Sequence, residues 1–222
     1  MSSRAPHSRH RSHAPAPGVS GASGAAGGGQ SARAQAERVA RQAPLEVRII
    51  GGAYKRSPLK VPVWPGLRPT PARVRETLFN WLGQDLNGWR VLDAFAGTGA
   101  LGLEAASRGA AAVLALEKEP ALARQIEANA RQLGARQVQV QVADALAWMR
   151  RQPAPAHDLV FLDPPFGEQM FAEALAAGSQ CVPVGGWIYL EADAPQAALP
   201  HLRLHRHDRA GAVHYHLFER MA

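Results

Sequence analysis

Asp163-Pro164-Pro165-Phe166 is the cluster whose residue types most clearly suit chemistry, and it directly follows the apolar run 158–162. Two consecutive prolines remove two backbone N–H groups and fix the turn, which leaves nearby carbonyls and the Asp163 carboxylate as acceptors. Acceptors that hold both hydrogens of a base amine would orient its lone pair and stabilise positive charge developing on nitrogen. Phe166 can stack on the base. The alternative for the same residues is an ordinary Asp-Pro turn after a strand.

A second cluster runs from Asp93 through Phe95 to Gly102 and is typical of a strand end, a glycine turn and a helix start. Gly97, Gly99 and Gly102 match the G-x-G-x-x-G pattern of dinucleotide-binding folds, although such a match alone is weak. Glycines let the backbone bend sharply and let a ligand approach it, and the helix start beyond offers free N–H groups.

Acidic residues follow the next two expected strands. Glu117 lies twenty residues after Gly97, and Asp144-Ala145 follows the third strand. A carboxylate at the first position can accept ribose hydroxyls, and Asp144 can accept from an adenine amino group, although each acid alone is as typical of a helix cap. Because the carboxyl ends of parallel strands meet at one edge of a sheet, together they predict a nucleoside site.

Asp93 helps to distinguish between the nucleoside cofactors that such a site could bind. A carboxylate before the glycine turn suits the cationic S-adenosylmethionine better than the pyrophosphate of NAD. It could equally serve as an acceptor that fixes the turn. The chemistry requires no metal, and none is expected.

These residues must be positioned by alternating strands and helices. Strands are expected at 90–95, 111–116, 138–142, 158–162 and 187–191, helices at 100–108, 120–133, 144–151 and 171–177, and a closing hairpin at 202–207 and 213–219. Repeated βα units predict an α/β fold with a mostly parallel sheet covered by helices on both faces. Upstream, 46–51 and 59–63 could pair as strands, and a helix over about 71–82 could be capped by Thr70.

Charge is unevenly distributed along the chain, whose net charge is +7. Residues 1–44 contain six arginines and one acid among Gly, Ala, Ser and Pro, which predicts a disordered basic tail. The basic character continues to residue 90, whereas the rest is mildly acidic; this fits a polyanionic partner. The single cysteine, Cys181, and the absence of a long apolar run predict a protein of the cytoplasm without a membrane span.

Three sequence segments near the N-terminus narrow the choice of protein family. Residues 47–52 (VRIIGG), 66–70 (GLRPT) and 73–82 (RVRETLFNWL), with the glycine turn and the Asp163–Phe166 turn, resemble the bacterial 16S rRNA guanine-N2 methyltransferases of the small-subunit methyltransferase D type. The resemblance covers about residues 46–220. It implies a Rossmann-like class I S-adenosylmethionine-dependent fold with a seven-stranded sheet and a short N-terminal β/α extension.

The resemblance also implies the reaction: methylation of the N2 amine of one guanine (966-type) in 16S rRNA of an assembled or assembling small ribosomal subunit. We therefore divide the chain into a tail (1–44), an RNA-facing extension (45–88) and a methyltransferase domain (89–222), and expect a monomer. The arginines that become candidates for rRNA contact are Arg48, Arg56, Arg68, Arg73 and Arg75.

Three alternatives stay open on the residues alone. Asp-Pro-Pro turns also serve DNA bases and protein amides, so a DNA or protein-amide N-methyltransferase is one. An NAD-dependent oxidoreductase could use the same glycine turn but leaves Asp163–Phe166 unexplained. A non-catalytic RNA-binding module is the third, and the intact motifs argue against it.

Overall fold

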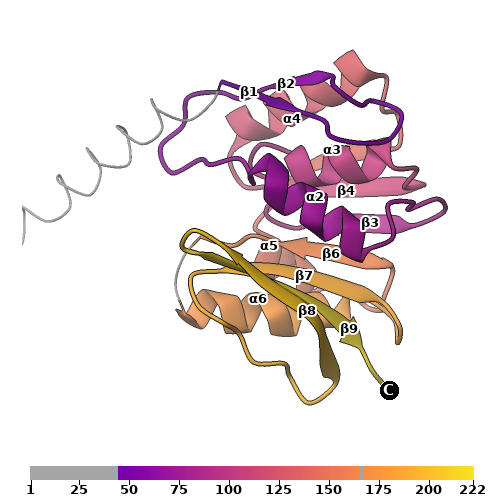
Figure 1. Cartoon of the computed structure of the whole chain (residues 1–222), viewed down its shortest axis with the longest axis vertical. Helices are drawn as coiled ribbons and strands as arrows, with labels where there is room; N and C mark the ends of the chain where they lie inside the picture. Colours follow the sequence, from indigo (N-terminus) through magenta and orange to yellow (C-terminus); the bar gives the residue numbers. More distant parts are fainter. Residues whose placement is uncertain (1–44, 166–167) are drawn as a thin grey trace, which may run out of the picture.

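The sheet at the centre of the molecule has seven strands in the order β5-β4-β3-β6-β7-β9-β8 (Figure 1). The computed structural model describes residues 45–165 and 168–222. The first five strands in this order are parallel, and β9 and β8 add an antiparallel hairpin at one edge. The strands are β3 (Arg90–Asp93), β4 (Ala112–Glu117), β5 (Val138–Val142), β6 (Leu159–Leu162), β7 (Trp187–Ala192), β8 (Leu202–Ala210) and β9 (Val213–Arg220).

Helices cover both faces of this sheet. Apolar residues of α5 (Ala145–Met149) and α6 (Glu168–Gln180) pack in one core cluster with β6 and β7. Those of α2 (Ala72–Trp81) and α3 (Ala100–Ser107) pack in a second, with other residues of the same strands. All four residues of β6 are buried, as expected for a central parallel strand covered on both sides. The predicted α/β class and mostly parallel sheet are confirmed.

The N-terminal extension is a separate layer. β1 (Glu46–Arg48) and β2 (Pro58–Lys60) form a two-stranded antiparallel sheet. Its apolar residues pack with those of α3 and α4 (Pro120–Leu133). The turn between the strands approaches α3 so closely that a Cβ on Gly52 would lie 1.8 Å from the Ser107 carbonyl oxygen, and the φ of Gly52 is +72°. Only glycine fits this position.

A buried ionic network fastens this extension to α3. The Glu104 side chain is completely buried and accepts hydrogen bonds from the backbone N–H groups of Ile50 (2.9 Å) and Gly51 (2.8 Å). It also pairs with the guanidinium groups of Arg75 (3.1 Å) and Arg108 (2.9 Å). Both oxygens of the carboxylate are therefore satisfied, which a buried charge requires.

Several sequence-based expectations need correction. Thr70 does not cap α2: the helix begins after Pro71 without a side-chain cap, and the Thr70 hydroxyl instead bonds to Glu191. The second strand is Pro58–Lys60 rather than 59–63. β8 extends to Ala210, beyond the expected end at 207, because it pairs with β9 as far as the hairpin turn. Helix α6 is also longer than the expected 171–177. Over the described ranges, no helix is both long and apolar enough to cross a membrane.

Candidate active site

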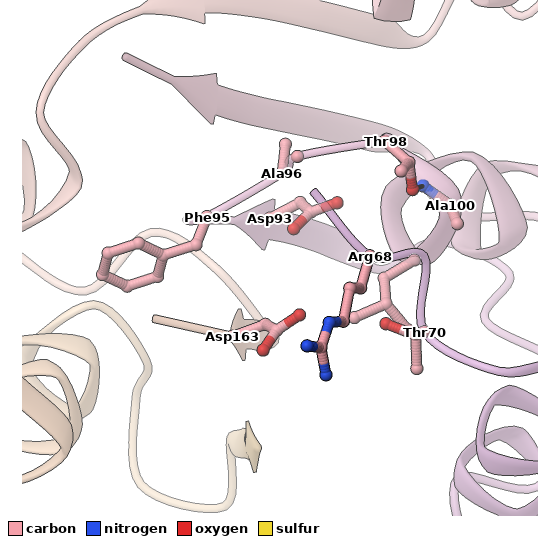
Figure 2. A pocket seen from close by; sticks show the side chains of 10 residues that line it. Arg68, Thr70, Asp93, Phe95, Ala96, Thr98, Ala100 and Asp163 are labelled. Atoms are coloured by element: carbon pink, nitrogen blue, oxygen red, sulfur yellow. Dashed lines mark hydrogen bonds between the residues drawn. The ribbon is translucent and has the colours of Figure 1, made fainter. Parts of the chain in front are cut away.

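Three carboxyl groups meet at the carboxyl ends of neighbouring strands. Asp93 ends β3 and pairs in register with Phe161, two residues before Asp163, which follows β6. Glu191 lies near the end of β7, the other neighbour of β6. Figure 2 shows the Asp93 and Asp163 side chains at the pocket that Arg68 also lines. The pocket is lined by Arg68, Thr70, Asp93, Phe95, Ala96, Gly97, Thr98, Ala100, Leu101 and Asp163.

The glycine turn forms one wall of this pocket. Gly97 and Gly99 have φ values of 51° and 75°, in the left-handed region that glycine adopts at low cost. A Cβ on Gly99 would lie 2.8 Å from the Ile126 side chain, so the turn also packs tightly against α4. Asp93 Oδ2 accepts the Gly102 N–H at 2.9 Å, and this bond ties the end of β3 to the first turn of α3. Asp93 therefore fixes the turn and also lines the pocket.

Burial and mutual repulsion disfavour charge on these acids. Burial raises the pKa of Asp93 to about 7; the bond from Gly102 opposes this rise, and the nearby Glu117 and Glu191 add to it. The pKa of Asp163 is raised well above its usual range, first by burial of its carboxyl group and then by Glu191 and Asp93. Burial likewise raises the pKa of Glu191. A cationic ligand would relieve this repulsion.

Glu191 is a residue of the candidate site that the sequence analysis did not single out. It is 5% exposed, accepts the Tyr189 hydroxyl at 2.9 Å, and also bonds to the Thr70 side chain. It therefore connects the segment that carries Arg68 to the carboxyl edge of the sheet. The signal was available, because Glu191 ends the expected strand 187–191 at the same edge as Asp93 and Asp163.

Glu117, Asp144 and Ala145, expected at the cofactor, lie outside the pocket lining. Glu117 Oε2 accepts the Gly97 N–H and Oε1 accepts the Glu119 N–H, both at 2.9 Å, so its carboxylate is held against the glycine turn. Asp144 is exposed and caps α5, with Oδ1 accepting the Ala147 N–H at 2.8 Å. Ala145 is buried in the first turn of α5. Phe95 does line the pocket.

The structure describes the turn that begins at Asp163 as far as Pro165. Pro164 is buried and Pro165 is exposed, while Phe166 lies outside the described residues. No group of three or more His, Cys, Asp or Glu side chains is placed to hold a metal ion within 45–165 and 168–222.

The five candidate arginines do not share one surface. Arg68 lines the pocket, Arg73 is exposed on α2, and Arg56 is exposed in the turn before β2. Arg48 is exposed and pairs with Glu46 at 2.8 Å. Arg75 was expected to face RNA, and this is wrong: it is 2% exposed, and its guanidinium is held by Glu104 and by the carbonyls of Arg48 and Thr70.

Residues 47–219 match the model of the family described as conserved hypothetical protein 95. The chain belongs to this family. Relatives include proteins named ribosomal RNA small subunit methyltransferase D. The Escherichia coli K12 protein is 40% identical over 187 residues, which are 80% of this chain and 91% of the relative. The Haemophilus influenzae protein is 36% identical over 181 residues, 78% and 94% of the two chains.

Solved structures agree with this family membership. An Escherichia coli protein described as a methyltransferase superposes with a TM-score of 0.72 at 38% identity, covering 80% of this chain and 99% of its own. A Haemophilus influenzae protein described as a methylase has a TM-score of 0.67 at 33% identity, covering 80% and 99%. The family and the fold are thus those of methyltransferases, as the N-terminal signature predicted.

Proposed function

We propose that this chain transfers a methyl group from S-adenosylmethionine to the N2 amine of one guanine (966-type) in 16S rRNA. The observation that carries the proposal is the meeting of the Asp163 turn and the glycine-turn pocket at one edge of the sheet. As an enzyme for ribosomal RNA it would act in the cytoplasm, as a monomer, on an assembled or assembling small subunit.

The residues of the pocket fit this cofactor. Asp93 and Asp163 place two carboxyls in a pocket that a cation would stabilise. Glu117 beside the glycine turn is suited to ribose hydroxyls, and the second oxygen of Asp144 to the adenine amine. When bound, S-adenosylmethionine supplies an electrophilic methyl group on a sulfonium. In their ionised forms the same carboxyls would repel the pyrophosphate of NAD, which argues against an oxidoreductase.

Asp163 is proposed to act on the amine. Its carboxylate and the carbonyls of the proline turn accept the two N–H hydrogens and align the nitrogen for in-line attack. When nitrogen bonds to the methyl group it must release a proton, and the raised pKa makes an ionised Asp163 carboxylate a better acceptor for it. Phe166 is proposed to stack on the base, and Arg68 to contact the target nucleotide.

The decisive test is transfer of labelled methyl groups to unmodified small ribosomal subunits, to naked 16S rRNA and to duplex DNA, followed by nucleoside analysis. We expect N2-methylguanosine in ribosomal RNA. Label in DNA alone, or on another base atom, would overturn the proposed substrate and support a DNA methyltransferase.

Asp163→Ala tests the role of the carboxylate. Removing the acceptor should lower kcat about 100-fold or more, the cost typical of losing one preorganised transition-state contact. The affinity for S-adenosylhomocysteine, measured by calorimetry, should stay within about threefold of the parent. Glu127→Ala, on the exposed face of α4, is the matched control. Near-parental turnover in Asp163→Ala would remove Asp163 from the mechanism.

A further inference from the structure

The β8–β9 hairpin carries a second group of basic residues that the proposed site does not use. β8 is the edge strand of the sheet, and most of its side chains are exposed. It contains Arg203, Arg206 and Arg209, with His205 and His207 between them and a single acid, Asp208. An exposed strand of this composition is a candidate surface for a polyanion.

The pairing of β8 with β9, and of β9 with β7, shows which end of β8 lies near the candidate site. Arg209 pairs with His214, which in turn pairs with Ala192 at the carboxyl end of β7. Arg203 pairs with Glu219, which pairs with Trp187 at the opposite end of β7. Arg209 therefore lies toward the end of the sheet where the parallel strands have their carboxyl ends, as Glu191 and Asp163 do. In Figure 1 the hairpin turn lies on the same side of the molecule as the segment leading into α2.

The distance from the catalytic turn suits a nucleic acid strand. Three strand spacings separate β6 from β8, and at about 4.8 Å each this is about 14 Å. The positive charge of Arg73 on α2 helps to lower the pKa of Asp208, so this end of α2 lies near β8. Arg68 in the pocket lining and Arg73 near β8 are further exposed cations on this part of the molecule.

The arginines of β8 differ in whether they have an acidic partner. The guanidinium of Arg203 is bonded to Glu219. Those of Arg206 and Arg209 bond only to nearby backbone carbonyls, at His205 and Gly211, in the described part of the chain. Their charge is therefore not neutralised by an acidic side chain. They retain the donors that a phosphate would accept.

We propose that Arg206 and Arg209, which the register places on opposite faces of the edge strand, bind phosphates of the rRNA segment flanking the target guanine where that segment crosses this edge. This inference rests on the proposed function and extends it to a surface formed by the C-terminal hairpin. The competing explanation is that the charges only protect an open sheet edge against pairing with another chain. The two explanations predict different changes in the same variant.

The test is binding of full-length protein to unmodified small ribosomal subunits, with S-adenosylhomocysteine present, at several KCl concentrations between 50 and 200 mM. For Arg206→Gln/Arg209→Gln we expect a dissociation constant at least about fivefold higher at low salt. The slope of log affinity against log salt should fall by about 1.5, because two phosphate contacts are lost. Arg203→Gln, on the same strand but paired with Glu219, should stay within about twofold.

Melting temperature and S-adenosylhomocysteine affinity of the double variant verify that its fold is intact. Unchanged affinity and salt slope would overturn the inference while leaving the proposed function standing. If the double variant self-associates in sedimentation but binds RNA as tightly as the parent, the inference is also overturned. That result would instead support the explanation that the charges keep the open sheet edge from pairing with another chain. If the parent protein itself binds no subunits, the proposed function fails first.

Discussion

The hydrogen bond that Asp93 accepts and the burial of its carboxyl group favour opposite protonation states. As the acceptor for the Gly102 N–H it is best ionised, whereas its nearly complete burial beside other acids favours the neutral form. The result is a carboxyl whose pKa is about 7. Its charge in the ligand-free protein therefore changes near neutral pH.

The free energy of unfolding should consequently fall as pH rises from about 4 to about 7. In this window the folded protein keeps a proton on Asp93 that the unfolded chain, with the ordinary value of 3.8, has lost. The difference amounts to about 2–3 kcal/mol between pH 5 and pH 7. The raised pKa values of Asp163 and Glu191 act in the same direction.

Asp93→Asn checks this by urea unfolding of ligand-free protein at pH 5 and pH 8. The variant should lose less stability between the two values than the parent. The free energy of unfolding of the variant should still fall with pH, because Asp163 and Glu191 remain. Glu127→Gln, an exposed substitution, should keep the parental slope. An equal loss of stability in Asp93→Asn and the parent would mean that Asp93 is ionised throughout.

At the residue scale, the sequence predicted which acids lie at the strand ends but not their proton affinities. Asp93, Glu117 and Asp163 could be placed because each lies at or just after the end of a recognisable apolar strand. Their pKa shifts depend on burial and on mutual approach, and strands far apart in the sequence bring these about. The role of Glu191 was missed because its partner Thr70 lies in a different layer of the fold.

Among the elements, α2 shows how a local pattern can mislead. The spacing of Val74, Leu78 and Leu82 correctly identified the buried face. Arg75 follows Val74 and was assigned to the exposed side, yet it is buried with Glu104 of α3. A buried arginine requires a partner, and no periodicity within α2 could identify one on another helix.

Arg75→Met should therefore destabilise the fold. Breaking a buried ion pair from one side typically costs about 3–5 kcal/mol, because the remaining charge loses its compensation. Here we expect the lower end, since Glu104 keeps Arg108 and two backbone donors. Arg73→Met, two residues earlier on the exposed face, should change stability by about 0.5 kcal/mol or less. Urea unfolding measures both, and equal small effects would contradict the structural role of Arg75.

For the molecule as a whole, the order of strands and helices could be predicted almost completely. The ranges of α4 and β5 agree with the structure residue for residue, because their apolar periodicity is regular. The two-stranded sheet was less well placed, since strands of three residues carry too few positions for alternation to be informative. Residues 1–44 lie outside the described part of the chain.

Deleting residues 1–40 should leave the fold and the cofactor site intact. The deleted segment is rich in Gly, Ala and Ser and contributes little apolar surface for burial. We expect the melting temperature to change by about 2 °C or less, and S-adenosylhomocysteine affinity to stay within about twofold. A large fall in melting temperature would show that the tail packs on the body.

The position of β6 in the sheet has a consequence for synthesis of the chain. β6 lies between β3, which is made much earlier, and β7, which is made later and is completed by pairing with β9. The cluster of Asp93, Asp163 and Glu191 therefore stays incomplete until Glu191 has left the exit tunnel, and the outer edge of β7 stays unpaired until β9 has followed.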